Sequence, residues 1–515
     1  MRTHHLRLPR RAALVTALGA CLWGGIVVSA VPCVAQDAPV VTLEDVLRMA
    51  LERSARVQIA RRDVDARDGQ RIEAAEPFDT LVAGSLAGTR QNSFVAGTTL
   101  PSTRTESMVY GGAAQKRLRS GIIVAPQFQV TGASAFQHGS VDFGQAQVRV
   151  DVVVPLMKDR GGAISAAPAR SAGYEREASA LRLRHAQAET VLAAAAAYWE
   201  YLAARGRLDV FRSAEARAQR MVEETRELVA AEERTTADLT QVLGNLAAKR
   251  ASRISAEQGV IDAWHQLAQT ASLTIAEALT PRAPATPFPE TSAAAPGRTL
   301  DQLVSQALML RQDLAAAERE VQAARALVEG ARSDLDDRLD LTLSGGYQGR
   351  MIGRGLDRLL SPFYRDVPGL DASAQVRYEV APQRSGARGR FLQQEAVAES
   401  RRIAQADLSR QIAIQVPVAV AACEHGQASL EAARDAVEKL ETTVQNEIRK
   451  FRLGMSTLFD VLLSEDSLTS ARLTEIQGQQ SHAVAIASLR FQTGALVQFQ
   501  GKDPLVRVAA LLTPQ

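Results

Sequence analysis

The sequence predicts a mainly helical protein with a β-barrel portion, built from two copies of one helix–strands–long-helix unit. Three observations support this fold class. Motifs recur at an offset of 257 residues (299 − 42), each copy holds an exceptionally long helical stretch, and strand-like sequence lies between the helices. No segment beyond the amino terminus offers the roughly 18 consecutive apolar residues of a membrane helix. The chain can therefore enter a membrane only as strands closed into a barrel.

Composition favours long helices over a compact aromatic core. The chain of 515 residues is 46% hydrophobic but only 4% aromatic, and Ala, Leu, Glu and Arg dominate long stretches. Its formal net charge is +3. Four arginines precede the first apolar run, so removing that segment leaves 3 − 4 = −1. A nearly neutral chain gives no electrostatic reason to expect a nucleic-acid partner.

Residues 1–35 have the pattern of a secretory signal peptide. They contain a basic start, an apolar run and the small residues Cys33 and Ala35 at the cleavage site. The mature chain would begin at Gln36. A lipoprotein cleavage before Cys21 and an uncleaved membrane anchor are the alternatives. Only Cys423 lies clearly in the mature chain, so no internal disulfide is expected.

The duplication divides the mature chain into a first repeat at 42–280 and a second repeat at 298–497. A proline-rich linker at 281–297 separates them and is expected to run along the outside of the helices. Residues 498–515 form a tail for which the sequence predicts no particular structure.

Each repeat opens with a helix that is capped at its first residue. Thr299 and Gln302 form a capping box, in which each side chain satisfies a free backbone N–H. Thr42 and Asp45 are the equivalent pair in the first repeat. Both threonines are therefore expected to be structural capping residues.

Strand-like segments follow each opening helix, which is expected to run continuously to about residue 75 or 336. Alternation such as Gln147-Val148-Arg149-Val150 is typical of a strand with one wet and one apolar face. A soluble hairpin would show the same pattern. The expected strands are 80–87, 107–114, 122–130, 147–154, 339–347 and 372–380.

Two rods of equal length can be built from the helices of each repeat. The long helix of roughly 65 residues would span about 100 Å. The opening helix and the arm after the long helix together would span about 105 Å. Such rods pack side by side, as in a coiled-coil wall. The expected long helices and arms are 163–231 with 237–272, and 390–452 with 456–492.

The segment Phe-Arg-Leu-Gly-Met-Ser-Thr-Leu-Phe-Asp-Val-Leu at 451–462 resembles the periplasmic hairpin of TolC-like outer-membrane efflux proteins. The order of elements over about 40–497 is similar to that family's layout. The resemblance implies a homotrimer that shares one barrel in the outer-membrane lipid and continues as a helical tunnel through the periplasm. An inner-membrane pump and a periplasmic adaptor would dock near the closed tip. The chain would be a passive conduit for small molecules or polypeptides in a tripartite efflux or type I secretion system.

Several positions depart from the family pattern. Leu463 stands where family members often carry a second acid, and Phe451 and Ser456 replace a tyrosine and an arginine. The family's tip-locking hydrogen bonds therefore cannot be copied onto this chain. The first repeat lacks the turn glycine, with Glu232 or Arg234 nearby. The stretch between its helices is also long, and it could hold four strands and a larger barrel, or two strands with extra loops.

Five residues, at the tips or inside a long helix, are the candidates for a role in the pore constriction or for a structural turn or kink. The resemblance implies that Asp460, and less directly Asp238, form an acidic ring at the pore constriction; the alternative is a first-turn acid that favours the helix dipole. Phe451 is either an apolar plug there or a packing residue. Gly454 is expected in the left-handed conformation at the turn. Pro417, inside the second long helix, should kink it.

No pattern predicts an enzyme, a cofactor or a metal site. The seven histidines lack metal-binding spacing, and Cys423, Glu424 and His425 cannot share one helix face. The competing hypothesis is a periplasmic coiled-coil scaffold or adaptor without a pore. The two hypotheses differ in whether the strands alternate between an apolar face and a polar face across a whole sheet.

Overall fold

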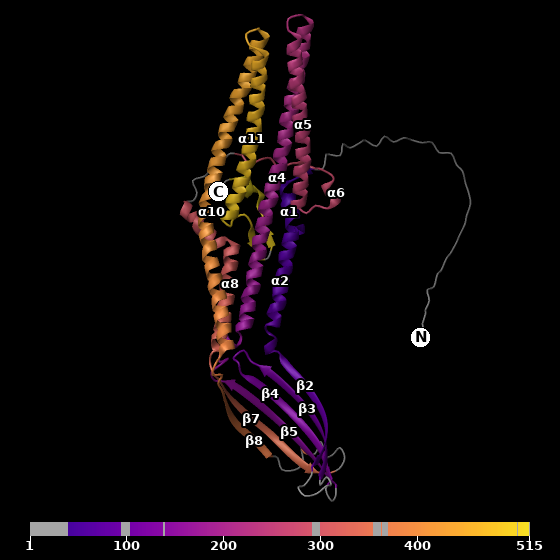
Figure 1. Cartoon of the computed structure of the whole chain (residues 1–515), viewed down its shortest axis with the longest axis vertical. Coiled ribbons are helices and arrows are strands. Elements are labelled where there is room, and N and C mark those ends of the chain that lie inside the picture. Colours follow the sequence, from indigo (N-terminus) through magenta and orange to yellow (C-terminus); the bar gives the residue numbers. More distant parts are fainter. Residues whose placement is uncertain are drawn as a thin grey trace, which may run out of the picture.

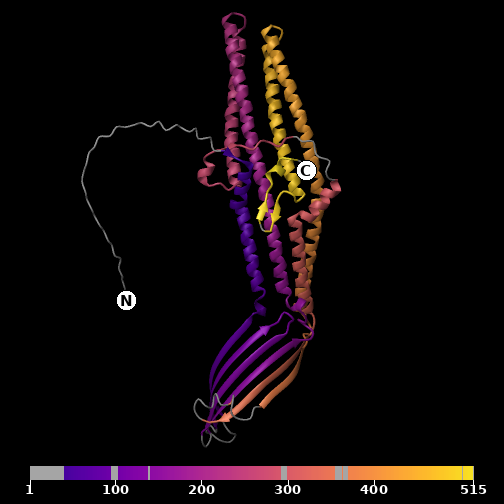
Figure 2. The same cartoon turned by 180° about the vertical axis from the view of Figure 1, so that it is seen from behind.

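The computed structural model of the chain is elongated, with a sheet at one end and helices that rise from it to two tips (Figure 1). Figure 2 shows the same arrangement from behind. The expected signal peptide, with Cys21 and Cys33, lies outside the described residues. The structure describes residues 40–93, 103–136, 140–290, 299–353, 362, 369–501 and 503–513.

Both opening helices are broken at the same repeat position. The first repeat has α1 (Leu43–Arg53) and α2 (Ala55–Glu73), and the second has α7 (Leu300–Leu310) and α8 (Gln312–Ser333). The prediction of a continuous helix was wrong. The residues at the two breaks, Ser54 and Arg311, occupy equivalent repeat positions and have ψ angles of 127° and 121°, far from the helical value. The caps are as predicted, since the Oγ1 atoms of Thr42 and Thr299 accept the N–H groups of Asp45 and Gln302.

The long helices confirm the paired-rod arrangement. Helix α4 (Ala167–Ala230) has 64 residues and α10 (Ser385–Arg452) has 68, or about 96 and 102 Å. Their arms, α5 (Thr236–Thr270) and α11 (Leu458–Gln492), have 35 residues each and pack along the half of the long helix nearer the tip. The opening helices cover the other half. Short helices are η1 (Glu76–Phe78), α3 (Gly162–Ser165), α6 (Ile275–Ala278) and α12 (Val508–Leu511).

The main hydrophobic core lies at mid-length, where α1, α4, α5 and α11 meet. Tyr198, Tyr201 and Trp264 are fully buried there. The hydroxyl of Tyr198 donates to the carbonyl of Thr286 (3.1 Å), and that of Tyr201 donates to Arg282 (2.7 Å). The first part of the inter-repeat linker is thereby held against the core. Two short two-stranded sheets flank the core. One pairs β1 (Val40–Val41) with β6 (Ala283–Pro284), and the other pairs β9 (Gln498–Gln500) with β10 (Asp503–Leu505).

In the described part of the chain, one antiparallel sheet contains six strands, in the order β2-β3-β4-β5-β7-β8. The first repeat supplies four of them and the second supplies two, so the larger of the two expected strand sets is the correct one. The strands are also longer than predicted. Their bounds are β2 (Thr80–Ser93), β3 (Thr103–Arg117), β4 (Ile123–Phe136), β5 (Ser140–Pro155), β7 (Arg338–Ile352) and β8 (Gly369–Glu379).

Among the described residues, no helix is both long enough and apolar enough to cross a membrane.

Candidate pore wall and tip

The six-stranded sheet has one apolar face. Side chains alternate along a strand, so the pairing register decides which residues share a face. One row across the sheet brings together Phe128, Val148, Tyr347 and Leu370. Among the described side chains, the large exposed hydrophobic ones of the sheet lie on this face, apart from Leu81, Val141 and Ile352. They are Val82, Leu86, Met108, Tyr110, Phe128, Val148, Val150, Leu343, Leu370, Val376 and Tyr378.

The opposite face is polar. The neighbouring row aligns Gln129, Gln147 and Gln348. Next to it, Arg149 donates to Asp151 (2.6 Å) and to the hydroxyl of Ser344 (2.9 Å). An apolar face of this extent is unusual in water and typical of a surface that meets lipid or protein. A polar opposite face is typical of the lining of an aqueous channel.

At the tip of the second repeat, a glycine ends α10. Gly454 has a φ of 72°, the left-handed conformation predicted from the sequence. A Cβ there would meet no atom within 4 Å, so the backbone conformation alone favours glycine. Helix α11 then starts at the capping residue Thr457.

Asp460 completes the cap of α11. Its Oδ2 atom accepts the backbone N–H of Thr457 (3.0 Å), the Thr457 hydroxyl (2.6 Å) and the hydroxyl of Ser456 (3.4 Å). Hydrogen bonds from Thr457 hold the pKa of Asp460 below its ordinary value. The residue is exposed at the tip, so its carboxylate is both a cap and a fixed negative charge.

The first repeat builds the same tip without glycine. Thr235 and Asp238 form the equivalent capping box of α5, at a constant offset from Thr457 and Asp460 (457 − 235 = 222). The same offset takes Gly454 to Glu232, which has a φ of 61°. Glu232 therefore occupies the turn position itself, in a conformation that side-chain-bearing residues adopt at a cost.

An apolar cluster joins the two tips inside one chain. Phe451 is buried and packs in a cluster with Met221 of α4 and Val461 of α11. The guanidinium of Arg234 lies over the Phe451 ring, 4.5 Å from its centroid. This position corresponds to the packing alternative for Phe451. Sequence reasoning gave Arg234 no role, because a cation–π contact between the two repeats leaves no local pattern.

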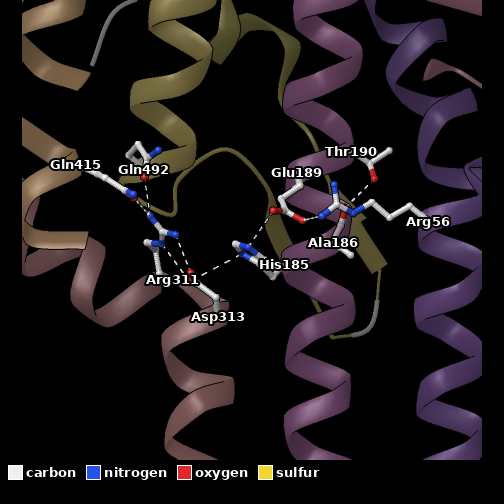
Figure 3. A network of polar contacts seen from close by, with 9 residues as sticks. All are labelled: Arg56, His185, Ala186, Glu189, Thr190, Arg311, Asp313, Gln415 and Gln492. Atoms are coloured by element: carbon white, nitrogen blue, oxygen red, sulfur yellow. Dashed lines mark hydrogen bonds and ion pairs between the residues drawn. The ribbon is translucent and has the colours of Figure 1, made fainter. Parts of the chain in front are cut away.

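Near mid-length, Arg311 is the centre of a polar network that crosses four helices (Figure 3). Its guanidinium binds both carboxylate oxygens of Asp313 (2.7 and 3.1 Å) and the amide oxygen of Gln492 (2.6 Å). His185 of α4 lies 3.9 Å from the Asp313 carboxylate. Only 8% of the Arg311 side chain is exposed. The helix break at Arg311 thus coincides with a buried ion pair that links α8 to α10, α11 and α4.

Pro417 lies within α10, and the helix continues on both sides of it. Gln415, two positions earlier, is 3.4 Å from the Arg311 guanidinium. Pro417 therefore lies close to the level of the break at Arg311.

Comparison with known proteins shows which proteins share this architecture. Residues 303–495 match the family of outer membrane efflux proteins. No curated protein matches the chain. The outer-membrane channel OprN is similar at 18% identity over 88% of this chain and 90% of that chain, with a TM-score of 0.65. The channel CmeC of Campylobacter jejuni (13%, 88% and 85%, 0.63) and VceC of Vibrio cholerae (16%, 88% and 96%, 0.62) are similar too. The resemblance stated from the sequence is confirmed.

Proposed function

We propose that this chain, with outer membrane efflux protein sequence at 303–495 and the fold of outer-membrane channels, is the outer-membrane component of a tripartite efflux or type I secretion system. It is a passive conduit that spans the outer membrane and extends into the periplasm. Three copies would form the channel, and an inner-membrane pump and a periplasmic adaptor would deliver substrate to its tip.

The two-faced sheet is the observation that carries this proposal. A conduit needs an apolar face toward lipid and a polar face toward water, and the register separates the two across all six strands. In a scaffold protein without a pore, an exposed apolar sheet face is not expected. The strands are 11 to 16 residues long, and about 9–11 residues suffice to cross a bilayer.

Neighbouring residues of β5 supply a matched test. Val148 is on the apolar face and Gln147 is on the polar face. A lysine on the lipid side near the bilayer centre costs about 2–4 kcal/mol, whereas lumen substitutions are tolerated. We expect Val148→Lys to reduce the amount of folded trimer in outer membranes, and Gln147→Lys to leave it unchanged. Equal behaviour of the two variants, or a soluble monomeric wild type, would contradict the proposal.

We propose that the acidic residues at the tips control the passage of cations through the channel. Three copies of Asp460, with Asp238 nearby, would place a ring of fixed negative charge around the channel axis. We expect Asp460→Asn to reduce cation selectivity and block by multivalent cations in planar bilayers. Since Asp460 also caps α11, Thr457→Ala serves as the control that weakens the cap and keeps the charge. Unchanged selectivity in Asp460→Asn, or an equal change in both variants, would refute the ring.

The tip of the second repeat also carries an apolar surface for a docking partner. Met455 is 75% exposed and Phe459 is 62% exposed. The offset between the two caps takes these positions to Glu233 and Ala237 in the first repeat. We therefore expect the adaptor to dock on the second-repeat tip. A photo-crosslinking residue at 455 should capture an adaptor of the same cell and one at 233 should not; the reverse result would refute this docking site.

A further inference from the structure

Among the described residues, no strand pairs with either edge of the six-stranded sheet. Every residue of β2 and every residue of β8 is exposed, whereas the strands between them have a neighbouring strand on both sides. Their backbone N–H and C=O groups on the outer side need partners, because a bilayer offers none. Six strands of alternating direction bring β8 of one copy antiparallel to β2 of the next. A second copy of this chain is therefore the occupant that fits each edge.

The repeat offset identifies an insertion in the first repeat. Before the strands, the starts of α7 and α1 give an offset of 300 − 43 = 257. After the strands, the starts of α11 and α5 give an offset of 458 − 236 = 222. The difference, 257 − 222 = 35, is close to the length of the hairpin β3–β4. Without this hairpin, each repeat would contribute two strands.

The hairpin changes the width of the sheet relative to the helices above it. Four helical rods, α2, α4, α8 and α10, stand side by side at the sheet end. At 8–10 Å between axes they cover an arc of about 32–40 Å. Strands spaced about 4.8 Å apart and tilted by about 40° take up roughly 6.3 Å of circumference each. Six strands then cover about 38 Å, and four would cover only about 25 Å.

We infer that three copies close an eighteen-stranded barrel, in which the inserted hairpin makes the barrel as wide as the helical tunnel. This inference rests on the proposed trimeric conduit. The barrel radius follows from three arcs of about 38 Å and is about 18 Å, against about 12 Å for twelve strands. The apolar and polar faces remain continuous around such a barrel if the β2–β8 register preserves the alternation.

Electron cryomicroscopy of the full-length protein in nanodiscs tests the inference directly. We expect eighteen strands in the cross-section and a backbone radius of about 18 Å. A trimer whose barrel has twelve strands, with β3 and β4 outside the wall, would overturn the inference and leave the proposed conduit intact. A monomer, soluble or closed on itself, would overturn both.

Excision of segment 102–136 removes the insertion and restores a single repeat offset. The shortened trimer should have twelve strands and a radius of about 12 Å. An unchanged radius would overturn the inference. If the shortened chain does not assemble, the strand count of the full-length protein still decides.

Cysteine pairs across the two edges give an independent measurement. Val82→Cys is combined in turn with Ala374→Cys, Val376→Cys and Tyr378→Cys, all on the apolar face. One pair should yield a disulfide-linked trimer. The same partners combined with Val130→Cys of the central strand β4 should not. Failure of all three edge pairs, or linkage through the β4 position, would overturn the edge pairing.

Discussion

Replacing Arg311 by alanine should destabilise the wall of helices at mid-length. The variant leaves the Asp313 carboxylate, which is only 16% exposed, without its bidentate partner. It also removes the donor to Gln492. Breaking a buried pair from one side costs about 3–5 kcal/mol, because the remaining charge stays buried. The pair of Arg402 with Glu399 is more than half exposed, so Arg402→Ala is the control and should not change stability measurably.

The assay is thermal unfolding of the purified protein in detergent. An unfolding entropy of about 2.1 cal/mol/K per residue gives roughly 1.1 kcal/mol/K if all 515 residues unfold together. The expected fall in Tm is then about 3–5 °C, and larger if a smaller unit unfolds. The double variant Arg311→Leu with Asp313→Leu should recover most of the loss, because an apolar pair leaves no buried charge. A Tm equal to wild type in Arg311→Ala would refute the reasoning.

The pH dependence of this difference provides a second check. Burial raises the pKa of Asp313, but the hydrogen bonds and charge of Arg311 outweigh it, and the net pKa lies below 3.8. The pair therefore stabilises the fold above pH 3.8 and loses its effect as the pH falls through the folded pKa. The gap in stability between wild type and Arg311→Ala should shrink as the pH falls below 3.8. A gap of constant size would show that the charge of Asp313 is not its cause.

Two further predictions concern the tips and the second repeat. Glu232→Gly should relieve the strain of the left-handed backbone by about 1 kcal/mol and slow amide hydrogen exchange at its tip roughly fivefold. Gly454→Ala should create a strain of about the same size and make exchange at its tip roughly fivefold faster. A change of the same sign in both variants would contradict the repeat alignment. Burial, together with the charge of Arg434, lowers the pKa of His482 below 6.5. The imidazole is therefore protonated less readily in the folded state than in the unfolded state, and the stability of the fold should decrease as the pH drops from 6.5. His482→Leu should reduce that fall in Tm, whereas the control His265→Leu, at an exposed position, should retain it; an identical pH profile in both would refute the role of His482.

The sequence predicted the features that depend on neighbours along the chain. The caps at Thr42 and Thr299, the lengths of the long helices and their arms, and the turn at Gly454 follow from side chains a few positions apart, and such patterns are present in any fold. Alternation within β5 was also visible. The 451–462 motif was sufficient to identify the family resemblance, because the tip turn is a continuous segment.

Features that depend on distant segments were decided by the tertiary structure. The break at Arg311 has no local helix-breaking residue; its ion pair and its contact with Gln492 become visible only when α8 and α11 lie side by side. The contact of the Arg234 guanidinium with the Phe451 ring joins the two repeats, so no local pattern predicts it. The number of strands in one sheet depended on pairing across the repeats, between β5 and β7, since register is set by contacts far apart in the chain.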